Sequence, residues 1–303
     1  MHVPVLLPKV LQFLSINKGE TVIDATAGGG GHTRALCEAV GESGMVIAID
    51  ADSAALGRVR DVLRGAVCRV EFIHGNFRDL GEMLQARGIR TVDKVLFDLG
   101  FSSDQLQYSG RGFSFERDEP LLMTFADRTS EGTLTAYEIV NSWSEGELVD
   151  ILGVYGEERR ARSIARAIVA ARKTAPIGTT RELVSVIESV GWPRQAPKSG
   201  RIHPATKTFQ ALRMAVNDEI GALEDGLRAA WGAFGPGGRM AVIAFHSIED
   251  RTVKHYFADL ARSGVAELLT KKPIVPTGAE VLANRRSRSA KMRAIQKAAS
   301  STQ

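Results

Sequence analysis

The chain lacks several features that would place it in common protein classes. It has only two cysteines, Cys37 and Cys68, which lie far apart and outside any CxxC motif. We therefore expect neither a disulfide framework nor a zinc or other metal site, and predict that each thiol is a small buried hydrophobic group in a reducing, cytoplasmic compartment. Because no run of about 18 apolar residues occurs, no membrane span is expected.

Two nucleotide-binding motifs are also missing. No GxxxxGK[ST] sequence is present, which argues against an ATP-type phosphate loop. A clean GxGxxG is absent as well, because Thr26 stands where the first glycine would be. The chain therefore lacks the usual fingerprint of a dinucleotide-binding protein.

A glycine-rich segment is the most informative feature that is present. The apolar run Thr21–Asp24 leads into Gly28 to Gly31, and His32 and Thr33 then open a predicted helix. Strand, glycine loop and helix start, in this order, build the cofactor site of parallel α/β sheets. Glycine is needed there because the backbone turns sharply and the ligand approaches it closely.

Hydrophobic patterning predicts an α/β protein with a mainly parallel sheet. Apolar strands alternate with helical segments, which indicates βαβ units covered on both faces. The predicted strands are Thr21–Ala25, Met45–Asp50, Val70–His74, Lys94–Leu99 and, much later, 236–246.

The long interval before the last strand is predicted to be a helical insert. Capping boxes begin helices at Ser144 and Thr179, and Ala161 opens an apolar helix face. One long helix, from about Thr206 to Phe234, is expected to lead back to the sheet. Residues 1–104 and 204–303 are thus predicted to form the cofactor-binding domain, and residues 105–203 an inserted all-helical domain.

Polar residues at the predicted strand ends indicate which cofactor is bound. Asp50 lies about twenty residues beyond the glycine loop, where a carboxylate accepts the ribose hydroxyls of an adenosine cofactor. Both NAD and S-adenosylmethionine carry such ribose hydroxyls, so Asp50 alone does not distinguish between them. The incomplete GxGxxG, Phe77 as a purine contact after strand three, and Asp98 after strand four favour the methyl donor. Asp98 could instead cap the next helix, and His32 could be an ordinary first-turn residue.

Several motifs together make the chain resemble the bacterial 16S ribosomal RNA (cytosine-N4)-methyltransferase family, which depends on S-adenosylmethionine. They run in the family's order: His2-Val-Pro-Val-Leu, Asp24-Ala-Thr-Ala-Gly-Gly-Gly-Gly-His-Thr, Phe97-Asp-Leu-Gly-Phe-Ser-Ser, Gly110-Arg-Gly-Phe-Ser-Phe, Tyr155-Gly-Glu-Glu-Arg, His203-Pro-Ala-Thr-Lys-Thr-Phe-Gln-Ala-Leu-Arg and Phe245-His-Ser-Ile-Glu-Asp-Arg. The resemblance implies a class I methyltransferase (Rossmann-like) sheet with a helical insert. It implies methylation of the exocyclic N4 of a cytidine in the decoding region of small-subunit ribosomal RNA. It also implies cofactor contacts at Gly30, Gly31, His32, Asp50, Phe77, Asp98 and Gln105.

One segment departs from the family pattern. Where the family usually reads Asp-Gly-Pro-Leu-Asp-Met-Arg-Met, this chain has Leu122 in place of the second carboxylate and Thr124 in place of the arginine. The polar interactions that the carboxylate and the arginine make in the family cannot be made in the same way here. The alternative function is therefore an RNA-binding ribosome-assembly factor with weak or lost methyl transfer. A nicotinamide-dependent oxidoreductase on the same sheet is a second rival.

Asp98 and His246 are the candidate catalytic residues. Asp98, or a backbone carbonyl beside it, is hypothesised to accept a hydrogen of the cytosine amine, unless Asp98 serves only the cofactor. His246 ends the fifth strand and either relays the proton or caps the following helix. Methylation at carbon 5 would need a cysteine nucleophile after a strand end, and neither Cys37 nor Cys68 lies there.

Basic residues near the C-terminus suggest a polyanionic partner. Eight lysines and arginines lie between Lys271 and Lys297 against Glu280 alone, although the whole chain carries only +4. The expected partner is 16S ribosomal RNA within the small subunit. The alternative is that these residues form a solvated basic tail without such a partner. The oligomeric state is left open, a homodimer included. The residues expected to bind RNA are Lys198, Arg201, Arg285, Arg286 and Arg288, with Arg194 and Lys207 as further candidates.

Overall fold

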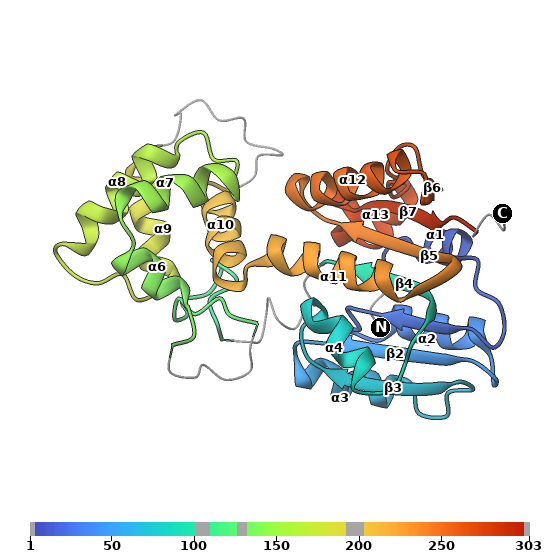
Figure 1. Cartoon of the computed structure of the whole chain (residues 1–303). Helices are drawn as coiled ribbons and strands as arrows, with labels where there is room; N and C mark the ends of the chain where they lie inside the picture. Colours follow the sequence, from blue (N-terminus) through green and yellow to red (C-terminus); the bar gives the residue numbers. More distant parts are fainter. Residues whose placement is uncertain (1–3, 101–109, 126–131, 192–202, 300–303) are drawn as a thin grey trace. The chain divides into compact units, whose positions relative to one another are not determined.

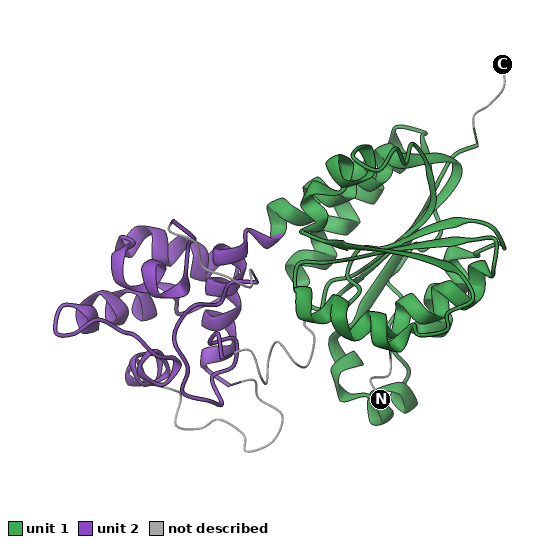
Figure 2. Ribbon diagram, turned by 90° about the horizontal axis from the view of Figure 1, so that it is seen from below, with its two compact units in different colours: residues 1–101, 220–303 green, residues 102–219 purple. Residues whose placement is uncertain are grey.

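The computed structural model describes residues 4–100, 110–125, 132–191 and 203–299. Its internal contacts divide the chain into two compact units (Figure 2). The first combines residues 1–101 with 220–303, and the second comprises residues 102–219. Relative to the predicted domain bounds, the segment 204–219 groups with the insert. Within the described ranges, no helix is both long enough and apolar enough to cross a membrane.

The first unit is built on a seven-stranded sheet of order β3-β2-β1-β4-β5-β7-β6 (Figure 1). The first five strands run parallel, whereas β7 is antiparallel to both of its neighbours. This arrangement confirms the predicted α/β class with a mainly parallel sheet. The strands are β1 (Thr21–Asp24), β2 (Met45–Asp50), β3 (Arg69–His74), β4 (Val92–Asp98), β5 (Phe234–Ala244), β6 (Ala266–Leu268) and β7 (Lys291–Lys297).

Helices cover both faces of this sheet. Successive strand residues point to opposite sides, so neighbouring residues of one strand contact different sets of helices. Val22 packs with α1 (Leu7–Leu14), α2 (Gly31–Val40) and α3 (Ser53–Val62). Its neighbour Ile23 packs on the other side, with α4 (Leu80–Gln85), α11 (Glu219–Ala233) and α12 (Ser247–Arg262). Three short elements complete the unit: η1 (Phe77–Asp79), α13 (Gly278–Ala283) and η2 (Arg285–Ser289).

In the part of the second unit that the structure describes, the regular elements are helices, apart from one isolated β-bridge between Pro120 and Thr179. Its helices are α6 (Ala136–Ser142), α7 (Glu145–Val154), α8 (Ala161–Arg172), α9 (Thr180–Ser189) and α10 (Ala205–Asn217). The predicted capping boxes at Ser144 and Thr179 are confirmed, and Thr135 makes a third with Glu138. In each box a side-chain oxygen accepts a hydrogen bond from an otherwise unpaired N–H of the first turn.

The prediction of one long helix from about Thr206 to Phe234 is wrong. The helix ends at Asn217, and Asp218 takes a left-handed conformation with φ of 44° before α11 begins. Arg213 and Glu219 form a two-pronged ion pair across the break, with Nε–Oε1 2.5 Å and Nη2–Oε2 2.8 Å apart. The apolar stripe stays in helical register across the break, so the sequence pattern alone does not reveal it.

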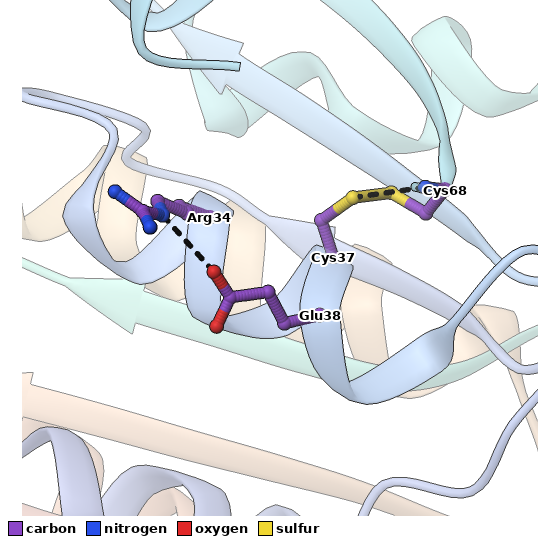
Figure 3. The surroundings of a disulfide bond; sticks show 4 residues. All are labelled: Arg34, Cys37, Glu38 and Cys68. Carbon is purple, nitrogen blue, oxygen red and sulfur yellow. Dashed lines mark hydrogen bonds and ion pairs between the residues drawn. A yellow bond between two sulfur atoms is a disulfide. The ribbon is translucent and has the colours of Figure 1, made fainter. Parts of the chain in front are cut away.

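The expectation that the cysteines are unpaired is also wrong. Cys37 of α2 and Cys68, just before β3, are both buried as predicted, but they form a disulfide (Figure 3). Packing of α2 on the sheet brings their Cα atoms to 5.3 Å, within the usual range for such a bond. A reducing compartment therefore no longer follows from the cysteines. On the same helix, Arg34 and Glu38 form an exposed ion pair one turn apart.

Candidate active site

The strand register brings the predicted acidic residues to one edge of the sheet. Asp24 lies opposite Ala48 of β2 and Leu96 of β4, while Asp50 and Asp98 are the last residues of β2 and β4. Ligands of open α/β sheets bind at this carboxyl edge. The strand register thus places three carboxylates on adjacent strands, at the edge where the sequence predicts a shared site.

Asp50 ties the glycine loop to the end of β2. Its Oδ2 accepts a hydrogen bond from the Gly28 N–H at 2.8 Å, and its Oδ1 accepts one from the Asp52 N–H at 2.9 Å. Gly28 has φ of 52°, which glycine adopts without strain. Burial raises the pKa of Asp50 to about 6, although the two backbone hydrogen bonds act in the opposite direction. Each carboxylate oxygen has a second lone pair, so Asp50 can still accept two further donors.

Asp24 is a buried support beneath the loop. It is fully buried, and its Oδ2 accepts a 2.7 Å hydrogen bond from the Thr33 hydroxyl while Oδ1 accepts a longer one from the Thr26 N–H. Burial raises the pKa of Asp24, and the positive charge of His32 lowers it in part. Asp24 therefore holds the two ends of the glycine loop together, through Thr26 and Thr33.

His32 links the N-terminal segment to Asp98. Its Nε2 lies 3.0 Å from the Val5 carbonyl and its Nδ1 lies 3.3 Å from Asp98 Oδ2. A carbonyl only accepts, so Nε2 carries a hydrogen, and Nδ1 facing a carboxylate carries one as well. Burial would lower the pKa of His32, but the hydrogen bond and charge of Asp98 outweigh it and raise the pKa. The raised pKa favours the charged form of the imidazole, and His32 positions Asp98.

Two glycines of the loop are required, one by a neighbouring residue and one by its backbone conformation. A Cβ on Gly31 would lie 2.7 Å from Pro4 Cγ, so Pro4 can pack on the loop only because residue 31 is glycine. Gly30 is the N-cap of α2 and has φ of 78°, a left-handed conformation that favours glycine; a Cβ there would touch Val59 and Val62 of α3 at 3.4 Å. The proximity of Pro4 and Val5 gives a structural reason for the His2-Val-Pro-Val-Leu motif, which the sequence analysis did not explain.

Asp98 leaves one oxygen directed at no described group. Its N–H donates to the Thr26 hydroxyl at 2.7 Å, and His32 occupies Oδ2. Oδ1 is buried and has no hydrogen-bond partner among the described residues. A buried acceptor without a partner is costly, so this oxygen is suited to receive a donor from a ligand.

Phe77 and His246 both make protein contacts. Phe77 packs edge-on against Phe97, with ring centroids 5.5 Å apart, and its ring lies where a side chain on Gly226 of α11 would otherwise sit. His246 caps α12: its Nδ1 accepts from the Glu249 N–H, while Glu249 accepts from the N–H groups of Phe245 and His246. The capping alternative for His246 is therefore present in the structure, and its role in proton transfer stays a prediction.

Other predicted site residues lie elsewhere or outside the described ranges. Arg285, Arg286 and Arg288 are exposed on η2. Lys207 donates to the Glu157 carbonyl within the second unit. The predictions that fall outside the described residues concern Phe101, Gln105, Arg194, Lys198 and Arg201.

The sheet order, the glycine loop and the carboxylate at the end of β2 fit a class I methyltransferase, and the family of the chain identifies S-adenosylmethionine as its cofactor. The sequence matches the MraW methylase family over residues 1–298, and the chain belongs to this family. Both the predicted family and the predicted cofactor are thus confirmed.

Curated relatives agree along the whole chain. The chain is 47% identical to ribosomal RNA small subunit methyltransferase H of Thermomicrobium roseum, covering 98% of this chain and 94% of that protein. The protein of the same name from Deinococcus radiodurans is 46% identical over 98% of this chain and 90% of its own length. Among solved structures, an rRNA methylase from Streptococcus thermophilus is similar with a TM-score of 0.46 and 13% identity, covering 98% of this chain and 99% of that one.

Proposed function

We propose that this enzyme transfers a methyl group from S-adenosylmethionine to the exocyclic N4 of a cytidine in the decoding region of 16S ribosomal RNA. The observation that carries the proposal is the unpartnered, buried Oδ1 of Asp98 at the carboxyl edge of the sheet. The names of the relatives, ribosomal RNA small subunit methyltransferase, support the substrate class. A ribosomal RNA substrate also supports a cytoplasmic location.

The residues at the carboxyl edge fit the cofactor. S-adenosylmethionine supplies an electrophilic methyl group when bound. Asp50 is proposed to accept the ribose hydroxyls with the lone pairs that Gly28 and Asp52 leave open. Backbone groups of Gly30 and Gly31, the ring of Phe77 and the amide of Gln105 are proposed as further contacts.

Asp98 is the proposed acceptor for a hydrogen of the cytosine amine. That amine is a weak nucleophile because its lone pair is delocalised into the ring, so the rate depends on holding it in line with the methyl group. The buried His32 cation fixes Oδ2 of Asp98 and so directs Oδ1. An equally open role for Oδ1 is to bind the cofactor alone. His246, two residues after β5, is the proposed relay for the released proton.

RNA binding is assigned to basic residues of both units. The helical insert, with Lys198 and Arg201 near its exit, is proposed to recognise the RNA. Arg285, Arg286 and Arg288, exposed on η2, are proposed to contact phosphates. The target base has to leave its stack to reach the cofactor, so these contacts would hold the RNA while the base is extruded.

Labelled S-adenosylmethionine and small ribosomal subunits lacking base methylation provide the test. After incubation, the RNA is digested and its nucleosides are identified by mass spectrometry, with N4-methylcytidine as the expected product. Asp98→Ala should lose turnover, and a parallel measurement of cofactor affinity separates its two roles. Near-normal turnover of the variant with normal cofactor affinity would remove Asp98 from both.

The same experiment distinguishes the RNA-binding assembly factor. Leu122 and Thr124 replace the polar residues of the family pattern, and Thr124 is buried in the helical unit. Cofactor and RNA binding without any labelled nucleoside would favour that alternative over methyl transfer.

A further inference from the structure

A basic pocket of the first unit lies beside the carboxyl end of β5. Its volume is about 420 Å³, and three segments line it: the first turns of α12, the chain after β6, and β7. The lining residues are Ser247, Asp250, Arg251, Lys254, Lys271, Lys272, Pro273, Lys291 and Arg293. Six of these nine side chains are cationic, and Asp250 is the single carboxylate.

The carboxylate of Asp250 organises the pocket and leaves most of its charge uncompensated. Its Oδ1 accepts a 2.6 Å hydrogen bond from Arg293 Nε, and its Oδ2 lies 3.4 Å from Lys291 Nζ. Burial alone would raise the pKa of Asp250, but Arg293 and Lys291 hold it below its ordinary value. One carboxylate therefore fixes two cations of β7 against α12 and, within the described ranges, makes no ion pair with Lys254, Lys271 or Lys272.

Three lysines of the pocket are available to a ligand. Lys254, Lys271 and Lys272 are exposed, and in the part of the chain that the structure describes none of them pairs with a carboxylate. Lys254 lies one helical turn after Arg251, so both are on one face of α12. Pro273 is the only apolar lining residue, so the pocket offers no hydrophobic anchor for a peptide or a membrane.

The position of the pocket relates it to the active site. Ser247 is the first residue of α12 and follows His246 directly, while Lys291 pairs with Ala244, the last residue of β5. Both therefore lie at the carboxyl end of β5, the edge to which Asp98 belongs. Flexible lysines that surround a polar hollow suit phosphate groups, which they bind as point charges without reading sequence.

We propose that this pocket binds backbone phosphates of the substrate RNA, in the stretch that flanks the extruded base. The inference rests on the proposed function, because it takes RNA as the substrate. It makes the prediction for the basic stretch Lys271–Lys297 more specific: Lys271, Lys272, Lys291 and Arg293 line the pocket, whereas the three arginines of η2 do not. The lysine ammonium groups of the site would bind the phosphodiester anions of one RNA strand.

A matched pair of triple variants tests the proposal. The first is Lys254→Gln with Lys271→Gln and Lys272→Gln. The control, Lys18→Gln with Arg69→Gln and Arg90→Gln, removes the same charge from exposed residues before or at the start of β1, β3 and β4, at the opposite edge of the sheet. Fluorescence anisotropy of a labelled single-stranded RNA from the decoding region gives affinity at several salt concentrations, and cofactor affinity serves as a folding check.

Losing three phosphate contacts should flatten the slope of log affinity against log salt by about 2, and weaken binding about a hundredfold near 0.1 M salt. The control should keep the slope of the unmodified protein, and both variants should bind S-adenosylmethionine normally. A pocket variant with unchanged slope and affinity would overturn the proposal. So would a pocket variant that keeps RNA binding but loses binding of a poly-glutamate peptide, which would indicate an acidic protein partner.

The two proposals fail in different ways. If the unmodified protein makes no N4-methylcytidine but the pocket variant still loses RNA affinity, the proposed reaction is wrong and the phosphate pocket stands. If methylation occurs and the pocket variant binds and methylates RNA normally, the reaction stands and the pocket proposal is wrong.

Discussion

Acidification should weaken cofactor binding through Asp50. The ribose hydroxyls donate hydrogen bonds, so the ionised carboxylate is the better acceptor, whereas the protonated form loses its charge and one acceptor position. Burial raises the pKa of Asp50 to about 6 in the free protein. A pKa raised in the free state means that protons compete with the cofactor below that pH, and binding releases a proton there.

The size of the effect follows from this pKa. If the bound state holds only the ionised carboxylate, the apparent Kd rises by about tenfold between about pH 7 and about pH 5. Isothermal titration calorimetry over this range gives the Kd, and buffers of different ionisation enthalpy count the released proton. Far-UV circular dichroism at each pH verifies that the protein stays folded.

Asp50→Asn is the control, because it keeps hydrogen-bonding oxygen at the position but cannot ionise. It should bind the cofactor more weakly at neutral pH and show little pH dependence, while Asp24 and His32 titrate as before. A Kd that does not change from about pH 7 to about pH 5 in the unmodified protein would refute the reasoning. An equal slope in the Asn variant would assign the proton to another group.

Three further predictions concern stability and RNA binding. Cys37→Ser with Cys68→Ser should lower the free energy of unfolding by about 3–4 kcal/mol, since the disulfide closes a loop across a sequence separation of 31 residues; coinciding urea curves with and without reductant would speak against it. His32→Leu removes the cation beside Asp98 and should cost about 3 kcal/mol, measured in the same way, and an unchanged unfolding midpoint would show that the pair is not structural. Neutralising the three arginines of η2, Arg285, Arg286 and Arg288, should weaken RNA binding and flatten its salt dependence. An unchanged salt slope would exclude them as phosphate contacts.

The parallel part of the sheet could be predicted because its strands are short apolar runs with turn signals at both ends. β2 matches its predicted bounds, Met45–Asp50, and the polar residues at the strand ends gave the edge of the site. The strand β7 could not be predicted in this way. Its sequence mixes basic, polar and apolar residues, and the buried Arg293 pairs with Asp250, which is far away in the sequence.

The missed parts of the site depend on contacts that no local pattern encodes. That His32 lies between Val5 and Asp98 follows from the return of the N-terminal segment across the glycine loop. The disulfide likewise depends on how α2 packs against the start of β3, and the spacing of Cys37 and Cys68 gives no sign of it. Local signals fix the elements, whereas side-chain partners need the folded chain.

The strand order has a consequence for the protein during its own synthesis. β4 is made by residue 98, but its sheet neighbour β5 starts only at residue 234, after the whole helical insert. Until then β4 is an edge strand with unpaired backbone groups on one side. β7 comes later still, although it lies between β5 and β6. A nascent chain therefore carries the cofactor loop and Asp98 long before β5 can pair with β4, so the carboxyl edge of the sheet is still incomplete while the insert is being translated.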